Sequence, residues 1–262
     1  MSSGCDIFSL QDKVIIVTGG TRKYGYYFCE GLCEAGGTVA VTSRDEERAK
    51  QMAQEFSSRG LKAFGYALEL ADDDSIEQLV TRVIQDHGKI DVLINNARRI
   101  PQMPPNEIDR EELGKLFDIN AVGQILLTRR VVEEMKKAGG GNIINIGSIY
   151  GMGGQDLSIY AEPEASYSLD YPIQKGGAIA YTKQLATILA RYNIRANCLT
   201  LGGLRETAPD DSHFLEHYCK RVPLGRMTVG DDVKGPIVFL ASDASAYMTG
   251  ANLVVDGGWT AW

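Results

Sequence analysis

The chain has 262 residues, enough for one large α/β domain with a sizeable buried core. Its formal net charge of −7 disfavours a nucleic-acid surface or an anionic membrane as a partner, and we expect neither. No apolar run is long enough to span a bilayer, and MSSGCDIFSL does not resemble a signal peptide. The five cysteines are an odd number without a CxxC pair, so we expect free thiols and a cytoplasmic location.

A strand, a glycine turn and a helix open the chain. The β-branched run at 13–17 is typical of a buried parallel strand, and it leads into TGGTRKYG at 18–25 and then a helical pattern. This is the context of a dinucleotide phosphate site, in which Gly19 permits the turn and Gly25 permits close approach of helix to strand. The spacing fits TGxxxGxG, with Lys23 in place of the middle glycine.

Strands and helices alternate along the rest of the chain, with no internal repeat or linker. Further strands are predicted at 37–44, 63–68, 91–94, 141–148, 194–199 and 252–258. Helices are predicted at 46–59, 110–137, 171–192, briefly within 205–222, from Asp231, and from an N-cap at Asp73 or Asp74. The pattern predicts one domain over 1–262, a Rossmann fold with a doubly wound, seven-stranded parallel sheet and helices on both faces.

Tyr171 and Lys175 carry the strongest catalytic signal. Residues four apart on a helix share a face, so the Tyr171 hydroxyl and the Lys175 ammonium can point into the same space. A nearby cation favours phenolate and lowers a tyrosine pKa from about 10, which suits proton transfer near neutral pH. Ser148, where the 141–148 strand ends, can hydrogen-bond the same substrate oxygen. A lone YxxxK pair is more often an ordinary surface pair, so the rest of the chain has to decide.

Seven motifs decide it. They are TGGTRKYG, INNA at 94–97, Asn120 within FDINAVG, INIGS at 144–148, YPIQK at 171–175, NIRANCL at 193–199 and VVDGG at 254–258. With these the chain resembles the short-chain dehydrogenase/reductase (SDR) family from end to end. The resemblance implies a nicotinamide cofactor and a proton-relay tetrad of Asn120, Ser148, Tyr171 and Lys175. In it Tyr171 is the acid/base, Ser148 holds the substrate oxygen, Lys175 binds the ribose and lowers the Tyr171 pKa, and Asn120 holds a water.

Several positions depart from the family pattern. Lys23 replaces a glycine, Glu69 replaces the aspartate near the adenine, Arg98 replaces the glycine of NNAG, and Leu201 replaces a proline. The interval from Ser148 to Tyr171 is also longer than the family norm. The substituted positions flank the expected cofactor, so its bound geometry could differ from that of the family.

The resemblance also implies the cofactor-binding set, without a metal. Its members are Gly19, Thr21, Arg22, Lys23, Tyr24, Gly25, Ser43, Arg44, Glu69, Leu70, Asn96, Ala97, Tyr171, Lys175, Gly202 and Leu204. An acidic residue after the second strand reads the ribose hydroxyl of NAD, whereas arginine accommodates the phosphate of NADP. Here Ser43 and Arg44 occupy that place, and Arg22 and Lys23 add two cations, so we expect NADP(H). If Asp45 turns inward to the ribose instead, NAD(H) is possible.

We expect an enzyme, because the Ser-Tyr-Lys set is intact; the alternative is a non-catalytic nucleotide-binding protein. The expected substrate is a polar, polyhydroxylated carbonyl or secondary alcohol, such as a sugar, sugar acid or cyclitol. The alternative is a 3-oxoacyl thioester. Segments 151–170 and 203–222 are predicted substrate lids. Segment 151–170 carries acids and no Lys or Arg, which disfavours an anionic substrate. In contrast, Arg98, Arg99 and Arg205 could bind a carboxylate or phosphate of the substrate. The alternative is that these three are solvated surface charges.

Two further expectations concern assembly and metal binding. By the same resemblance, the helices at 110–137 and 171–192 and the last strand imply a homotetramer, with a homodimer as the alternative. His213 and His217 are four apart, which could place two metal ligands on one helix face. We expect surface positions there instead, because no third ligand is obvious nearby.

Overall fold

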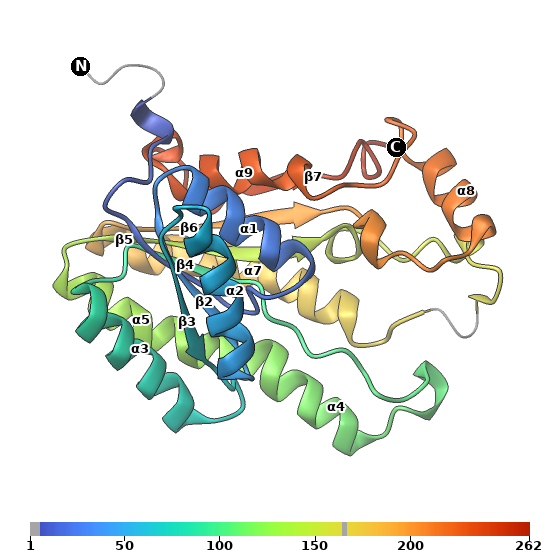
Figure 1. Ribbon diagram of the computed structural model, residues 1–262. Coiled ribbons are helices and arrows are strands. Elements are labelled where there is room, and N and C mark those ends of the chain that lie inside the picture. The colour runs from blue at the N-terminus through green and yellow to red at the C-terminus, as the bar shows by residue number, and fades with distance from the viewer. Residues whose placement is uncertain (1–5, 164–166) are drawn as a thin grey trace.

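The computed structural model describes residues 6–163 and 167–262, and it places seven parallel strands in one sheet (Figure 1). The strands pair in the order β3-β2-β1-β4-β5-β6-β7. Their bounds are β1 Val14–Val17, β2 Thr38–Ser43, β3 Ala63–Ala67, β4 Val92–Asn95, β5 Gly141–Ser148, β6 Ile194–Leu201 and β7 Asn252–Val255. The order reverses between β1 and β4, which is where a doubly wound sheet binds its ligand. The predicted fold class is confirmed.

Helices cover both faces of the sheet. On one face α1 (Lys23–Glu34), α2 (Glu46–Ser58) and α9 (Asp231–Ala241) share a core with alternate strand residues such as Ile15 and Val17. On the other face α3 (Asp73–His87), α5 (Gln124–Lys137) and α7 (Tyr171–Leu189) pack on the intervening strand residues, Val14 and Ile16 among them. A strand buried on both faces needs a continuous apolar run, which is what the sequence has there.

Three predicted helix details differ from the structure. The helix expected at 110–137 is interrupted: α4 (Arg110–Phe117) and α5 are joined by a π-helical turn at Asp118–Gly123. The helix expected at 171–192 ends at Leu189 and continues as a 3₁₀ turn. The N-cap of α3 is Asp72, whose Oδ1 accepts from the Asp74 amide at 2.9 Å. Asp73 and Asp74 therefore lie in the first turn, where carboxylates favour the helix dipole.

The two segments predicted as lids pack on one another (Figure 1). The 3₁₀ turn Leu157–Ile159 and helix α8 (Ser212–Arg221) share a third apolar cluster with Trp259 near the C-terminus. The rings of Tyr160 and Phe214 lie 5.2 Å apart, and Asp156 pairs with Arg221 at 3.4 Å. Residues 164–166 of the first segment lie outside the described residues. That the pair acts as a lid stays a prediction.

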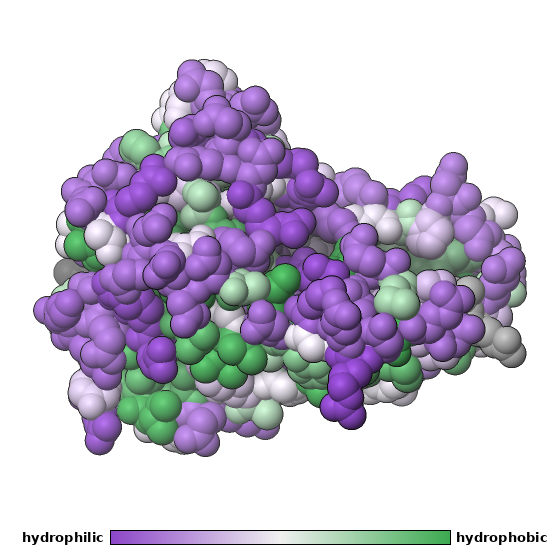
Figure 2. All heavy atoms as spheres, turned by 90° about the horizontal axis from the view of Figure 1, so that it is seen from below, coloured by the Kyte–Doolittle hydropathy of each residue, from purple (hydrophilic) through white to green (hydrophobic). Residues whose placement is uncertain are grey.

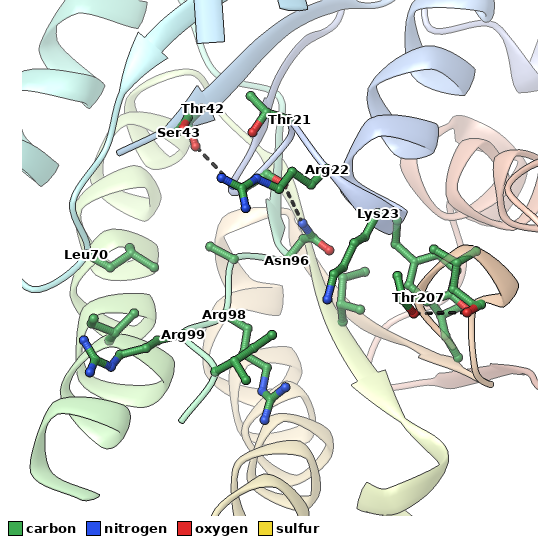
Figure 3. Close-up of a pocket in the computed structure, with 18 of the residues that line it drawn as sticks. Thr21, Arg22, Lys23, Thr42, Ser43, Leu70, Asn96, Arg98, Arg99 and Thr207 are labelled. Carbon is green, nitrogen blue, oxygen red and sulfur yellow. Dashed lines mark hydrogen bonds between the residues drawn. The ribbon is translucent and has the colours of Figure 1, made fainter. Parts of the chain in front are cut away.

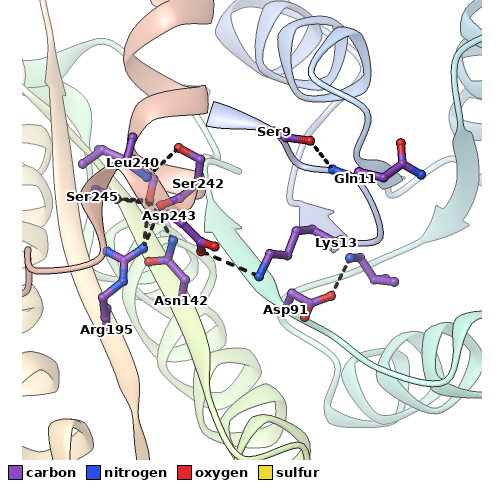
Figure 4. A network of polar contacts seen from close by, with 12 residues as sticks. Ser9, Gln11, Lys13, Asp91, Asn142, Arg195, Leu240, Ser242, Asp243 and Ser245 are labelled. Carbon is purple, nitrogen blue, oxygen red and sulfur yellow. Dashed lines mark hydrogen bonds and ion pairs between the residues drawn. The ribbon is translucent and has the colours of Figure 1, made fainter. Parts of the chain in front are cut away.

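A polar network closes the amino edge of the sheet, away from the predicted site (Figure 4). Arg195 donates to the Met248 carbonyl at 3.0 Å, and Asn142 donates to the Leu240 carbonyl at 2.7 Å. Lys13 pairs with Asp243 at 3.8 Å. Arg195 and Asn142 thus bond carbonyls at and beyond the end of α9, where a helix leaves its last carbonyls without intrahelical partners. This edge is therefore structural.

The described residues offer neither a membrane span nor a metal site. No helix among them is long and apolar enough to cross a membrane. Nor does that part of the chain hold a cluster of three metal-ligating side chains, and His213 and His217 simply stack on one another on α8.

Candidate active site

A cavity of about 530 Å³ lies at the carboxyl ends of the strands (Figure 3). All but one of the predicted cofactor-binding residues line it: Gly19, Thr21, Arg22, Lys23, Tyr24, Ser43, Arg44, Glu69, Leu70, Asn96, Ala97, Tyr171, Lys175, Gly202 and Leu204. Gly25 does not, because it lies behind the glycine turn. Thr42, Leu68, Ile119 and Thr207 line the cavity too, and the sequence analysis missed them. Thr42 could have been found, since it immediately precedes Ser43, which was predicted to bind the cofactor.

The glycine turn between β1 and α1 is held too tightly to accept side chains. Gly19 has φ +65°, and a Cβ on Gly25 would lie 2.2 Å from the Gly19 oxygen. Asn96 fixes the turn by donating to the Thr18 carbonyl at 2.8 Å and to the Gly19 carbonyl at 3.2 Å. The N-cap position of α1, Arg22, makes no side-chain capping bond within the described chain. The first amides of α1 are thus available to an anion.

Lys23 adopts a conformation that favours glycine. Its φ is +52°, in the left-handed region, and its side chain points into the cavity (Figure 3). Burial lowers the pKa of Lys23, and the neighbouring charges of Arg98 and Arg22 lower it further. A strained residue at a binding cavity is a reason to look for function there.

The end of β2 presents cations and no carboxylate to the cavity. Arg44 is exposed at its rim, and Arg22 reaches across toward Ser43 (Figure 3). Asp45 is the N-cap of α2, where Oδ1 accepts from the Arg48 amide at 3.2 Å, and it does not line the cavity.

Tyr171 and Lys175 stand at the opposite end of the cavity, on the first turns of α7. The Lys175 ammonium lies 5.8 Å from the Tyr171 ring centre and donates to the Ile146 carbonyl at 2.6 Å. Burial, and after it the charge of Arg98, lowers the pKa of Lys175 to about 8. Gly151 packs against this helix, since a Cβ there would lie 2.6 Å from the carbonyl carbon of Lys175.

Ser148 and Asn120 flank the cavity without lining it. Ser148 is buried at the end of β5, where its Oγ accepts from the Tyr150 amide at 3.2 Å. Asn120 lies in the π-helical turn, accepting from the Arg99 amide at 2.7 Å and donating to the Arg99 carbonyl at 2.9 Å. Its amide therefore fixes the loop after β4. The roles predicted for these two residues stay predictions.

The three arginines considered as anion clamps have different surroundings. Arg98 lines the cavity with its Cζ 4.0 Å from the Tyr171 ring centre. Arg99 turns the other way (Figure 3), and its Nη2 donates to both carboxylate oxygens of Glu112 at 3.1 and 2.8 Å. Arg205 is exposed and does not line the cavity.

Sequence comparison fits this geometry. A family model described as enoyl-(acyl carrier protein) reductase matches residues 24–260. The chain belongs to the short-chain dehydrogenase/reductase family. The prediction that it is an SDR oxidoreductase is thereby confirmed.

Individual relatives align with this SDR over nearly its whole length. It is 31% identical over 260 residues to 2-dehydro-3-deoxy-D-gluconate 5-dehydrogenase of Formosa agariphila, covering 97% of this chain and 94% of that one. It is 33% identical to the 3-oxoacyl-[acyl-carrier-protein] reductase of Aquifex aeolicus, covering 95% and 98%. Among solved structures, gluconate 5-dehydrogenase of Burkholderia cenocepacia J2315, in complex with NADP and tartrate, superposes with a TM-score of 0.88 at 31% identity, covering 98% and 99%.

Proposed function

We propose that the chain transfers hydride between NADP(H) and a secondary alcohol or carbonyl of a polar, polyhydroxylated small molecule. One observation carries the cofactor choice. The cavity end that would receive the ribose holds Arg22 and Arg44, whereas the first carboxylate after β2, that of Asp45, caps α2 and does not line the cavity. Cations favour a phosphate there, because charge-assisted hydrogen bonds are the strong ones.

The rest of the cavity fits a dinucleotide. The free amides at the start of α1 and the side chain of Lys23 suit the pyrophosphate. Lys175 and Tyr171 also line the cavity, and we assign Lys175 to the nicotinamide ribose and Tyr171 to the reacting carbon. A bound nicotinamide supplies or accepts the hydride.

The chain's own residues handle the proton and the substrate oxygen. Tyr171 gives a proton to the carbonyl oxygen in reduction, or takes it from the hydroxyl in oxidation. Lys175 holds positive charge beside the phenol, and it is anchored for this by the Ile146 carbonyl. Ser148 at the end of β5 is assigned to hold the same oxygen. Asn120 keeps the loop after β4 in place by its two bonds to Arg99.

Relatives support a sugar-acid substrate and one alternative. The Formosa agariphila and Burkholderia cenocepacia proteins are named as dehydrogenases of gluconate-type acids, and the latter was solved with NADP. The Aquifex aeolicus relative and the description of the family model favour a 3-oxoacyl thioester as the second candidate. An activity screen with NADP(H) across sugar acids, cyclitols and acyl thioesters separates the two.

Self-association is proposed on exposed apolar side chains. Val122 and Ile125, beside and on α5, and Ile173 and Ile188 on α7 are each 45% exposed or more. Figure 2 shows apolar side chains gathered among polar ones on the underside of the molecule. A second copy that covers them forms a homodimer, and a further contact at the last strand would join two such dimers into the homotetramer. Cys29, Cys33 and Cys198 are buried free thiols, which suits the proposed cytoplasmic location.

The cofactor proposal is tested with charge variants. Measure kcat/KM with NADP(H) and with NAD(H) for the native chain, Arg22→Ala, Arg44→Ala and a control, Lys62→Ala. Lys62 is an exposed cation that does not line the cavity. We expect a native preference for NADP(H) that falls in both arginine variants and not in the control. A native preference for NAD(H), or a preference that Arg44→Ala leaves unchanged, contradicts the proposal.

A further inference from the structure

Arg98 is a cation at the reactive end of the cavity. It follows β4, lines the cavity and stacks on Tyr171, its Cζ 4.0 Å from the ring centre. By resemblance, glycine is the family residue here, so neither the backbone nor the fold requires an arginine. Figure 3 shows its side chain running away from Arg99, although the two are neighbours in sequence.

The charge of Arg98 is not neutralised within the part of the chain that the structure describes. No carboxylate of those residues forms an ion pair with it, and its Nε is buried without a hydrogen-bond partner there. Asp170 is the carboxylate whose charge acts on Arg98. The Asp170 carboxylate, however, already accepts from the Ser168 hydroxyl and the Gln174 amide, both at 2.8 Å. Arg99 also has a buried Nε without a partner, but its charge is paired, since its Nη2 donates to both carboxylate oxygens of Glu112.

Two cations also interact with Arg98. Lys23 and Lys175 line the same cavity, and each has its pKa lowered in part by Arg98. Phosphates of a bound dinucleotide would offset Lys23, which leaves Arg98 as the cation facing the substrate. Burying an unpaired guanidinium is costly unless an anion joins it.

The acidic segment above the cavity opposes an anion less than its composition predicts. Asp156 is paired with Arg221. Asp170 is buried, and its carboxylate accepts hydrogen bonds from Ser168 and Gln174. Glu164 lies outside the described residues. Asp156 and Asp170 therefore repel an anionic substrate less than free carboxylates would.

We propose that Arg98 binds a carboxylate of the substrate beside Tyr171, so that the substrates are hydroxy acids and the matching oxo acids. The inference rests on the proposed function and narrows its substrate class. A planar guanidinium matches a carboxylate with two parallel N–H···O bonds. In oxidation the substrate carbinol loses its hydride to NADP⁺ and its hydroxyl proton to Tyr171, and the carboxylate is unchanged.

The test compares acids with their neutral amides. Bind D-gluconate and D-gluconamide to the full chain with NADP⁺ by calorimetry, and measure turnover of aldonates of several lengths with the matching amides. We expect the acids to be preferred by about 10- to 100-fold, the range for hydrogen bonds between charged groups. Arg98→Gln removes the preference by weakening the acids alone. Arg98→Lys keeps part of it, which guards against a misfolded glutamine variant, and Lys62→Gln leaves the preference intact.

Three results overturn the inference: no preference for acids in the native chain, a preference that survives Arg98→Gln, or equal loss for acids and amides. The last would mean that Arg98 acts only through Tyr171. Turnover of neutral polyols with NADP(H) but no preference for acids overturns the role of Arg98 and leaves the proposed function standing. If no polyol or sugar acid is turned over, the proposed function fails, and calorimetry still decides whether Arg98 binds a carboxylate.

Discussion

Removing the Arg98 charge should move the pH dependence of alcohol oxidation. Arg98 Cζ and Lys175 Nζ lie 4.0 and 5.8 Å from the same Tyr171 ring centre, so the two cations are within about 10 Å of each other. At that distance two unit charges interact by about 0.4 kcal/mol in water and about 1.7 kcal/mol at an effective dielectric constant of 20. This corresponds to roughly 0.3 to 1.2 pKa units.

The sign follows from the charge. Arg98 disfavours the protonated form of Lys175 and so helps to bring the Lys175 pKa down to about 8. In Arg98→Gln that repulsion is gone and the Lys175 pKa rises. Lys175 supports proton transfer at Tyr171 only while it is charged, so the limb of kcat/KM that decreases with pH should move to higher pH by about 0.3 to 1.2 units.

The assay is kcat/KM for oxidation of one neutral substrate across the pH range, so that binding of a carboxylate plays no part. Lys62→Gln is the matched control, because it removes an exposed cation that does not line the cavity. A limb that stays in place in Arg98→Gln, or moves to lower pH, refutes the electrostatic reasoning.

Three further predictions address other parts of the chain. Lys23→Gly should leave the melting temperature unchanged or raise it by up to about 2 °C, because relief of left-handed strain offsets the added entropy of the unfolded chain. The KM for NADP(H) should rise about 3- to 10-fold in this variant. An unchanged KM would exclude a role of Lys23 in cofactor binding. Ile125→Glu together with Ile173→Glu should dissociate the assembly by light scattering at micromolar concentration, whereas a native monomer would contradict the proposed interface. Hydrogen exchange over residues 151–163 should be faster than in β5 without ligands and should slow with cofactor and substrate; protection equal to β5 from the start argues against a lid.

The sequence alone predicted the architecture because the apolar runs are local signals. A strand buried on both faces is favoured by a continuous apolar run, as in β1, so the order of apolar runs and helical patterns along the chain determines the layers. The strand ends then place Gly19, Ser43, Asn96 and Gly202 at one edge of the sheet without further information. The sequence does not predict which of two or three adjacent, similar residues makes a given contact.

Three cases show the reason. Arg98 and Arg99 are identical in type and adjacent, yet one faces Tyr171 and the other Glu112, because Asn120 fixes the backbone between them and α4 supplies the acid. The π-helical turn that holds Asn120 needs Gly123 next to the Leu70 carbonyl, a contact between distant segments. Asp72 caps α3 in place of two adjacent aspartates that are equally good by propensity.

The most direct test of the central claim is the turnover of Tyr171→Phe with NADP(H). Phenylalanine keeps the ring that packs against Arg98 and removes only the hydroxyl that transfers the proton. The account predicts a folded protein that binds NADP(H) as the native chain does and whose turnover falls by about 10²- to 10⁴-fold. A folded Tyr171→Phe protein with near-native turnover would contradict it.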